Sequence, residues 1–171
     1  MAGPTPVSAL IHAATMVTAG VFLLARLYPV LAQSLTVMTV IAIVGVITLL
    51  FGGLLAVVQD DIKKVLAYST VSQIGYLFLL LPLATLAPAP LALEAWSGGV
   101  YHAVSHAFAK SAMFLAAGAI VHALGHDRIV GISGLATGLP VSTYAFGIAG
   151  ITLIGLLGAL LIPRDPGRTE S

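Results

Sequence analysis

Residues 96–123 read WSGGVYHAVSHAFAKSAMFLAAGAIVHA, and this apolar run decides the fold. It exceeds the roughly 20 residues that a helix needs to cross a hydrocarbon core, yet Lys110 lies near its middle. A lysine at that depth costs about 2.5–3.5 kcal/mol on insertion scales. Steps of four residues place His102, His106 and Lys110 along one face of the helix. The run therefore predicts a transmembrane helix with a stripe of titratable groups, which is typical of a proton or ion relay.

Composition indicates an all-α protein embedded in a lipid bilayer. Hydrophobic residues make up 59% of the chain and charged residues 8%, whereas soluble domains have about 25% charged residues. The formal net charge of +1 argues against a nucleic-acid partner. The chain has no cysteine, which excludes a disulfide, a thiolate metal site and a thiolate-bound iron–sulfur cluster.

Apolar runs long enough to cross a membrane predict a polytopic bundle of about five helices over residues 1–162. The expected spans are about 6–28, 35–58, 64–83, 96–124 and 139–162. The third is expected to end at Pro82 and the segment Pro88-Ala89-Pro90. Residues 163–171 are polar and are expected to form a disordered tail. The N-terminus lacks the basic region of a cleavable signal peptide.

Charge does not orient these spans. Five crossings place three basic residues on one side of the membrane and three on the other, so the positive-inside count is balanced. The first group is Lys63, Lys64 and Arg128, and the second is Arg26, Arg164 and Arg168.

Polar and small residues inside the spans predict further helices as neighbours. Polar side chains within a membrane hydrogen-bond across helix interfaces or line wet cavities. The first span has His12 and Thr15, and the third has Ser69, Thr70, Ser72 and Gln73. Glycines such as Gly118, Gly147 and Gly150 are expected to let helices approach closely. Five helices could not easily satisfy all these polar groups, so we expect other subunits or further copies of the chain as partners.

Each buried polar residue also has a structural interpretation. Lys110 could form an ion pair with a buried carboxylate, but Glu94, sixteen residues earlier, is the acidic residue nearest to it in this span. Such a carboxylate would then belong to another chain. His102 and His106 could be neutral imidazoles bonded to a neighbouring helix. Histidines four residues apart can also share a metal, but no carboxylate is near and an ammonium would repel a cation, so no metal site is predicted. A bis-histidine haem lacks any supporting motif.

The connection between the second and third spans carries a group of charges, Asp60, Asp61, Lys63 and Lys64. One interpretation is a solvated loop whose charges pair locally. The other is an electrostatic element at the mouth of a channel, in which Asp61 and Lys63 are the candidate residues. His122 and His126 flank a helix end and are expected at the membrane interface.

Three stretches resemble the antiporter-like subunits of respiratory complex I, and together the resemblance covers roughly residues 2–155. They are GPTPVSALIHAATMV at 3–17, VQDDIKKVLAYSTVSQIGY at 58–76, and YHAVSHAFAKSAMFL at 101–115. The wording SQIGY at 72–76 is most similar to the largest such subunit, the chain L or subunit 5 type. Subunits of Mrp-type cation/proton antiporters and of membrane-bound hydrogenases share the same blueprint.

The resemblance implies a mechanism in which a buried lysine between two half-channels takes up and releases protons. Lys110 matches that lysine, and His102 and His106 match the adjoining relay histidines. His12 matches the histidine that links the first half-channel to the centre, and Asp61 and Lys63 match charged positions at the start of the next span. The resemblance also implies that the loop at 60–64 faces the cytoplasm or the matrix.

The resemblance further implies a larger subunit, of about fourteen helices in two inverted repeats, a logic general to transporters. We therefore expect a truncated or split subunit, or a fragment from a frameshifted gene. The glutamate and lysine of the first half-channel would precede Met1, and the charge near the exit would lie beyond the other end of the chain.

Three functional hypotheses follow. The chain is a membrane component of a proton-pumping NADH:quinone oxidoreductase in a bacterial inner membrane. Alternatively, it is a subunit of a multi-subunit Na⁺/H⁺ antiporter of the Mrp type or of a membrane-bound hydrogenase. The third hypothesis is a remnant that transports nothing. No cofactor site is predicted in this chain, so any oxidoreductase activity would belong to its partners in the complex.

Overall fold

The structure is a computed structural model that describes residue 11 and residues 16–161; His12 and residues 163–171 lie outside that part of the chain. Helices dominate the described residues. In chain order they are α2 (Met16–Leu31), α3 (Leu35–Val57), α4 (Ile62–Leu86), α5 (Ala89–Leu124), the 3₁₀ turn η2 (Ile129–Gly131), α6 (Leu135–Gly138) and α7 (Pro140–Leu161).

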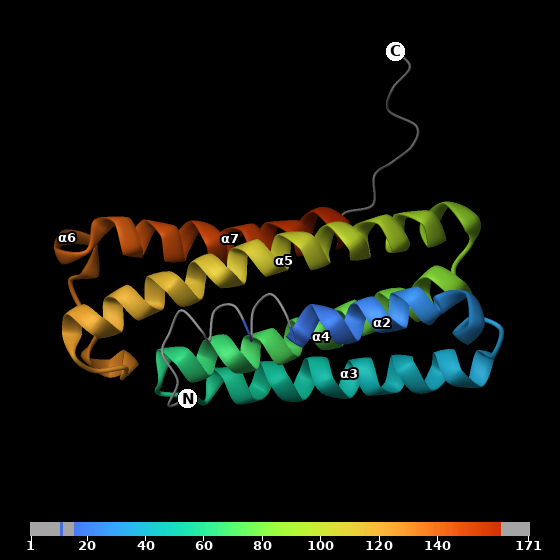
Figure 1. Ribbon diagram of the computed structural model, residues 1–171, viewed down its shortest axis with the longest axis horizontal. Coiled ribbons are helices and arrows are strands. Elements are labelled where there is room, and N and C mark those ends of the chain that lie inside the picture. The colour runs from blue at the N-terminus through green and yellow to red at the C-terminus, as the bar shows by residue number, and fades with distance from the viewer. Residues whose placement is uncertain (1–10, 12–15, 162–171) are drawn as a thin grey trace, which may run out of the picture.

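The long helices lie alongside one another, with α4 in a central position (Figure 1). One side of α4 packs against α3 and another against α5, while α2 also contacts it. The bundle is extended by α7, which packs along α5. The α4 helix contacts α2, α3 and α5, so its residues form one side of three helix interfaces.

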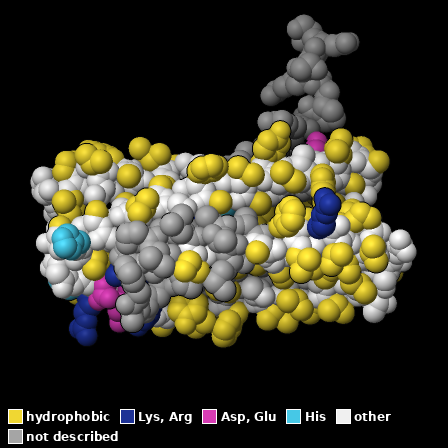
Figure 2. All heavy atoms as spheres, in the orientation of Figure 1, with side chains coloured by type: hydrophobic (Ala, Val, Ile, Leu, Met, Phe, Trp, Pro, Cys, Tyr) yellow, Lys and Arg dark blue, Asp and Glu magenta, His cyan; other side chains and the backbone are white. Residues whose placement is uncertain are grey.

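Helix length and apolarity show a multi-pass membrane protein. Among the described residues, α3, α4 and α5 are long and apolar enough to cross a bilayer, and shorter apolar stretches occupy Ala19–Leu31 and Pro140–Leu153. Figure 2 shows hydrophobic side chains along the length of the helices and a group of acidic and basic side chains at one end. The predicted fold class, an all-α membrane helix bundle, is confirmed. The number of five crossings stays a prediction.

Two helices extend beyond the expected spans. The α4 helix runs through Pro82 to Leu86, because an interior proline is tolerated in a membrane helix whose neighbours satisfy the freed backbone groups. The α5 helix begins at Ala89 rather than Trp96, with Pro90 in its first turn, where a missing N–H costs no helical bond. Its 36 residues correspond to about 54 Å, which exceeds a hydrocarbon core of about 30 Å.

Glycines bring α3 and α4 into backbone contact. A Cβ at Gly75 would lie 2.4 Å from the Leu49 amide nitrogen, and a Cβ at Gly52 would lie 2.6 Å from the Ser72 amide nitrogen. Ser72 Oγ also donates a hydrogen bond of 2.9 Å to the Leu49 carbonyl. Without a hydrophobic driving force between helices in lipid, such close packing is a main source of helix association.

The glycines that the sequence pattern singled out are packed more loosely. A Cβ at Gly150 would meet the Met113 methyl at 3.8 Å, an ordinary contact, and a Cβ at Gly147 would meet no described atom within 4 Å. Within the described residues no helix approaches closely at these two positions, and close approach of another subunit there stays a prediction.

Two loops pair at one end of the bundle and hold α4 and α5 together there. The Ile62 N–H donates to the Asp127 carbonyl at 3.1 Å, and the Ile129 N–H donates to the Asp60 carbonyl at 2.8 Å. The α5 helix ends just before this pairing at Gly125, whose φ of 72° is a left-handed conformation that favours glycine. The pairing places Lys63 and Arg128 at the same end of the bundle, as the count of crossings predicts.

Candidate functional site

Three titratable side chains of α5 are buried in one row. The exposed fractions are 0% for His102, 1% for His106 and 2% for Lys110. The ring centroids of His102 and His106 are 6.2 Å apart. The row lies near the middle of a 36-residue helix, so these polar groups are far from both helix ends.

The Lys110 ammonium group meets neutral oxygen atoms of α4. Its Nζ donates a short hydrogen bond to Ser69 Oγ and a longer one of 3.4 Å to the Leu66 carbonyl. That carbonyl also accepts a hydrogen bond of 2.8 Å from Thr70 Oγ1. Leu66 and Phe114, next to Lys110 in the core, are at most 1% exposed. Among the described residues, Lys110 therefore has polar contacts with a hydroxyl and a carbonyl, and none with a carboxylate.

His102 is held by two residues of α4. Its Nε2 lies 2.8 Å from Gln73 Oε1. The Tyr76 ring packs edge-on against the imidazole, with centroids 5.0 Å apart and planes at 73°. The hydrogen bond and the aromatic contact together fix the orientation of the ring.

His106 lies between these two anchored groups and has no anchor of its own among the described residues. Both of its ring nitrogens are buried without a hydrogen-bond partner there, and so is Nδ1 of His102. A buried polar atom without a partner costs about 1–3 kcal/mol, so native structures usually supply water or a neighbouring group. A water or a further polar group is thus expected beside the middle of the row.

The register of the two helices explains this pattern. Lys110 and His102 are about 12 Å apart along α5, whereas Ser69 and Gln73 are about 6 Å apart along α4. The long lysine stem covers the difference, since side chains on a helix lean toward its N-terminus. Ser69 and Gln73 therefore bond to Lys110 and His102, the two outer groups of the row. His106, between them, has no partner on α4 among the described residues.

The two charged loop candidates lie away from this row. Asp61 caps α4: its Oδ1 accepts hydrogen bonds from the Lys63 amide at 2.8 Å and the Lys64 amide at 3.3 Å. It precedes Ser69 by about two helical turns, or roughly 12 Å. The structure thus gives Asp61 a local capping contact. His122 and His126 are exposed at the end of α5, and His12 lies outside the described residues.

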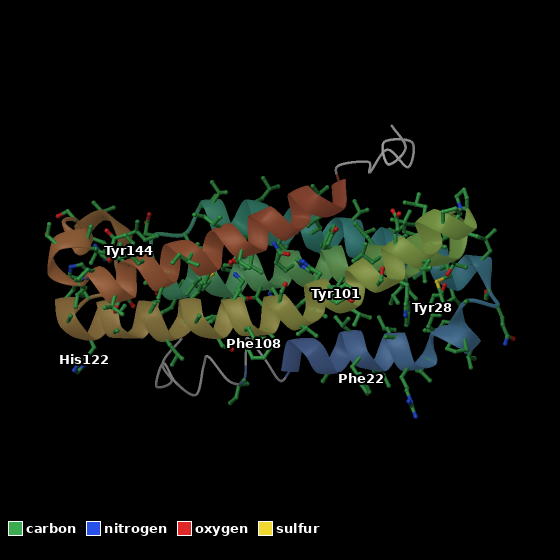
Figure 3. All side chains as sticks on the ribbon, turned by 90° about the horizontal axis from the view of Figure 1, so that it is seen from above. Phe22, Tyr28, Tyr101, Phe108, His122 and Tyr144 are labelled. Carbon is green, nitrogen blue, oxygen red and sulfur yellow. The ribbon has the colours of Figure 1, made fainter. Side chains whose placement is uncertain are left out.

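An apolar cleft of about 650 Å³ adjoins the row between α2, α4 and α5. Figure 3 shows Phe22 on α2 and Phe108 on α5, two of its lining residues. Ala103 and Ala107, which alternate with the buried histidines along α5, also line it. The lining residues are apolar, so the described part of the cleft offers no polar partner to His106.

The described residues contain no group of three or more His, Cys, Asp or Glu side chains that could hold a metal ion. The two buried histidines are accompanied by an amine instead of a third ligand. The chemistry that the row can support is acceptance, donation and transfer of protons.

Comparison with known proteins places this arrangement in a family. Residues 1–160 match the family model described as NADH:quinone oxidoreductase/Mrp antiporter, TM. The chain belongs to this family. The NADH:quinone oxidoreductase/Mrp antiporter region covers almost all of the helices described above.

Relatives of the same family are substantially longer than this chain. NADH-quinone oxidoreductase subunit L of Escherichia coli (strain K12) is 46% identical over 157 residues, which are 91% of this chain and 24% of the relative. NAD(P)H-quinone oxidoreductase subunit 5, chloroplastic, of Gossypium barbadense is 42% identical over 167 residues, with 91% and 21% covered. F(420)H(2) dehydrogenase subunit L of Methanosarcina mazei is 43% identical over 155 residues, with 91% and 22% covered. The chain thus spans about a quarter of the length of these relatives. The predicted resemblance to antiporter-like subunits of the L or 5 type is confirmed.

The structure adds Ser69 and Gln73 to the residues of the site. The sequence indicates that they hydrogen-bond across a helix interface, and the structure identifies Lys110 and His102 as the groups they meet. Their four-residue spacing, which matches that of the α5 row, is a signal that could have pointed to this pairing. Tyr76, three residues further along the same face, was not singled out.

Proposed function

We propose that this chain contributes a buried segment of a proton-translocation pathway to a membrane complex of the NADH:quinone oxidoreductase type. The segment consists of Lys110, His106 and His102. The names of the relatives support this class of complex, since they are subunits of quinone oxidoreductases and of an F(420)H(2) dehydrogenase. Electron transfer would take place in partner subunits, with this chain binding no redox cofactor.

The observation that carries the proposal is the neutral environment of a buried lysine. A fixed carboxylate would commit Lys110 to its charged form, because breaking a buried ion pair costs several kcal/mol. A hydroxyl and a carbonyl oxygen accept a hydrogen bond from an amine whether it is charged or neutral. The contacts of Lys110 are of this second kind, so they let the group change its protonation state without losing its partners.

The unpartnered histidine supports a relay through the row. His106 is adjacent to Lys110 on the same face of α5 and keeps two ring nitrogens free of described partners. A water bridging these groups would find the polar atoms that it needs. Protons would then pass between Lys110, His106 and His102 in short steps.

The remaining residues extend the path in both directions. His12 is proposed to connect the row to the first half-channel. Asp61 and Lys63 are proposed as charges at the mouth of the path, where the paired loops gather several charged side chains. Partners would be other membrane subunits of the complex, and the location would be a bacterial inner membrane.

The experiment is a lysine-to-methionine substitution in the assembled complex, reconstituted in lipid vesicles. Met preserves the length and packing of the stem and removes the proton-binding amine. We expect Lys110→Met to abolish proton translocation driven by quinone reduction. The matched control is Lys64→Met at an exposed lysine of the same chain, which should retain translocation. Coupled translocation in the Lys110→Met complex would overturn the proposal.

A second candidate is a subunit of an Mrp-type Na⁺/H⁺ antiporter or of a membrane-bound hydrogenase. The family description, which includes the Mrp antiporter, favours keeping it. Purification of the chain with its native partners distinguishes the candidates: redox subunits that reduce a quinone indicate an oxidoreductase, and sodium-driven proton movement without a redox partner indicates an antiporter. A chain that recruits no partners and moves no protons would be the remnant.

A further inference from the structure

Gln73 and His102 form a buried contact between α4 and α5. Of its two atoms, the imidazole nitrogen can donate or accept a hydrogen bond, and the amide oxygen can only accept one. The distance from His102 Nε2 to Gln73 Oε1 is 2.8 Å, and the imidazole is fully buried. The amide oxygen is an acceptor without a hydrogen to give. With the amide oxygen facing the ring, the imidazole nitrogen is the donor that carries the hydrogen of the bond.

We propose that Gln73 is a positioning residue that fixes the proton of His102 on Nε2 and closes that nitrogen to proton transfer. This inference rests on the proposed function of the row as a proton relay. A neutral imidazole has one donor and one acceptor nitrogen, so Nδ1 is left as the bare acceptor. This nitrogen is buried and has no partner among the described residues. It is thus the atom of His102 that can receive a proton from the row.

The contact prevents proton transfer from continuing beyond His102. A proton that arrives at Nδ1 gives an imidazolium, which could pass a proton onward from Nε2 only if the group there could accept it. A carboxamide does not take up a proton in the physiological range. The proton must leave from Nδ1 again, unless the bond between Nε2 and Gln73 breaks.

The other end of the row differs in this respect. Lys110 donates to the Ser69 hydroxyl, and a hydroxyl both donates and accepts. A hydroxyl can accept one proton and donate another, and an amide oxygen cannot. The helix α4 thus offers a conducting partner to Lys110 and a blocking partner to His102. Transfer past His102 would require a movement of α4 or α5 that separates Gln73 from the ring, which would prevent a passive leak.

The first test measures the ring nitrogens directly. The full chain, labelled with ¹⁵N-histidine, is placed in lipid bilayers, and solid-state NMR separates protonated from bare nitrogens. For His102 we expect a protonated Nε2 and a bare Nδ1. Gln73→Leu keeps the bulk and removes the acceptor, and should convert His102 to a mixture of both forms. Ser72→Ala is the matched control: Ser72 lies next to Gln73 on the same helix, but its hydroxyl bonds to the Leu49 carbonyl of α3.

Two results of this measurement would overturn the proposal. A protonated Nδ1 and bare Nε2 in the unsubstituted chain would mean that the amide faces His102 through its NH₂ group. An unchanged Nε2-protonated form in Gln73→Leu would mean that another group selects the proton position.

The second test measures passive proton leak in vesicles that contain the complex under an imposed pH gradient, without electron donor. Gln73→Glu replaces the amide by a carboxyl group that can accept the Nε2 proton. A positioned acid–base group speeds proton transfer by roughly 10²-fold or more, and we expect a leak increased by about that factor. Ser72→Ala should leak as little as the unsubstituted complex. An unchanged leak in Gln73→Glu would overturn the role of Gln73 as a block. The Lys110→Met translocation assay tests the proposed function separately. The nitrogen signals of His102 do not depend on transport, so the two proposals can fail independently.

Discussion

On the side of α4 that faces α3, glycine brings two backbones together until no side-chain atom fits between them. On the side that faces α5, polar side chains keep the helices apart and bond across the space. The first stripe includes Ser72 and Gly75, and the second includes Ser69 and Gln73. The two stripes are adjacent on one helix, rotated by about 100°, yet they use opposite means of association.

The contact between α3 and α4 is rigid, and the contact between α4 and α5 is reactive. A contact between backbones is determined by shape, and a shift of a few tenths of an ångström produces a clash or a void. A contact between hydroxyl, amide, imidazole and amine can exchange partners, and one member of the row, His106, has none among the described residues. The α3–α4 contact can therefore hold α4 in place while the α4–α5 contact changes its protonation state.

The largest effect is expected where the rigid contact is broken. Gly75→Ala would place a Cβ 2.4 Å from the Leu49 nitrogen and 2.7 Å from the Gly45 carbonyl oxygen. Both are backbone atoms that no rotamer change can move, so the cost should reach or exceed the upper part of the usual overpacking range, about 3 kcal/mol. Unfolding in detergent micelles titrated with SDS measures this loss of stability.

A neighbouring glycine of the same interface is the control for this prediction. A Cβ at Gly53 would meet Ser72 Oγ at 3.6 Å, which is ordinary contact. Gly53→Ala should leave stability within about 0.5 kcal/mol of the unsubstituted chain, or raise it slightly because alanine is the better helix former. Equal stability of the two variants would show that the α3–α4 contact is looser than its geometry indicates.

Two serines three residues apart test whether the stripes carry different tasks. Ser69→Ala removes the hydroxyl that Lys110 meets, and leaving a buried donor short of a partner costs about 1–3 kcal/mol. If the hydroxyl acts in the relay, a comparable change in barrier slows proton translocation by about tenfold. Ser72→Ala removes a hydrogen bond to the Leu49 carbonyl and should reduce stability by about 1 kcal/mol with translocation retained. Vesicle assays and SDS titrations on both variants give the comparison, and equal translocation rates would contradict it.

The sequence predicts the row on α5 well because helical spacing alone places His102, His106 and Lys110 on one face. It does not predict which face of α4 they meet. Ser69, Thr70, Ser72 and Gln73 are all polar residues within one turn and a half, and their assignment to α3, to α5 or to their own helix depends on rotation and register. Those are set by the packing of Gly75 of α4 against α3 and of Gly52 of α3 against α4, a relation between residues distant in sequence.

Helix ends were also predicted incompletely, and for a local reason. Proline usually limits a helix, which led to an expected end near Pro82. The α4 helix continues to Leu86, because the cost of an interior proline depends on what surrounds it. Pro82 is buried among neighbouring helices, and this is tertiary information. The family motifs, by contrast, are local strings, and they indicated the family directly.

The smallest effect is expected at the start of α4, which both stripes share. Asp61 accepts hydrogen bonds from the amides of Lys63 and Lys64, so Asp61→Ala should reduce stability by about 1 kcal/mol through loss of the N-cap. Asn caps as well as Asp, so Asp61→Asn keeps the cap and removes the charge. Because Asp61 is proposed as a charge at the mouth of the path, Asp61→Asn should slow proton translocation slightly and leave stability in SDS titration unchanged. Translocation equal to that of the unsubstituted chain would mean that Asp61 serves α4 only as its cap, and that the contribution of α4 to the path begins at Ser69.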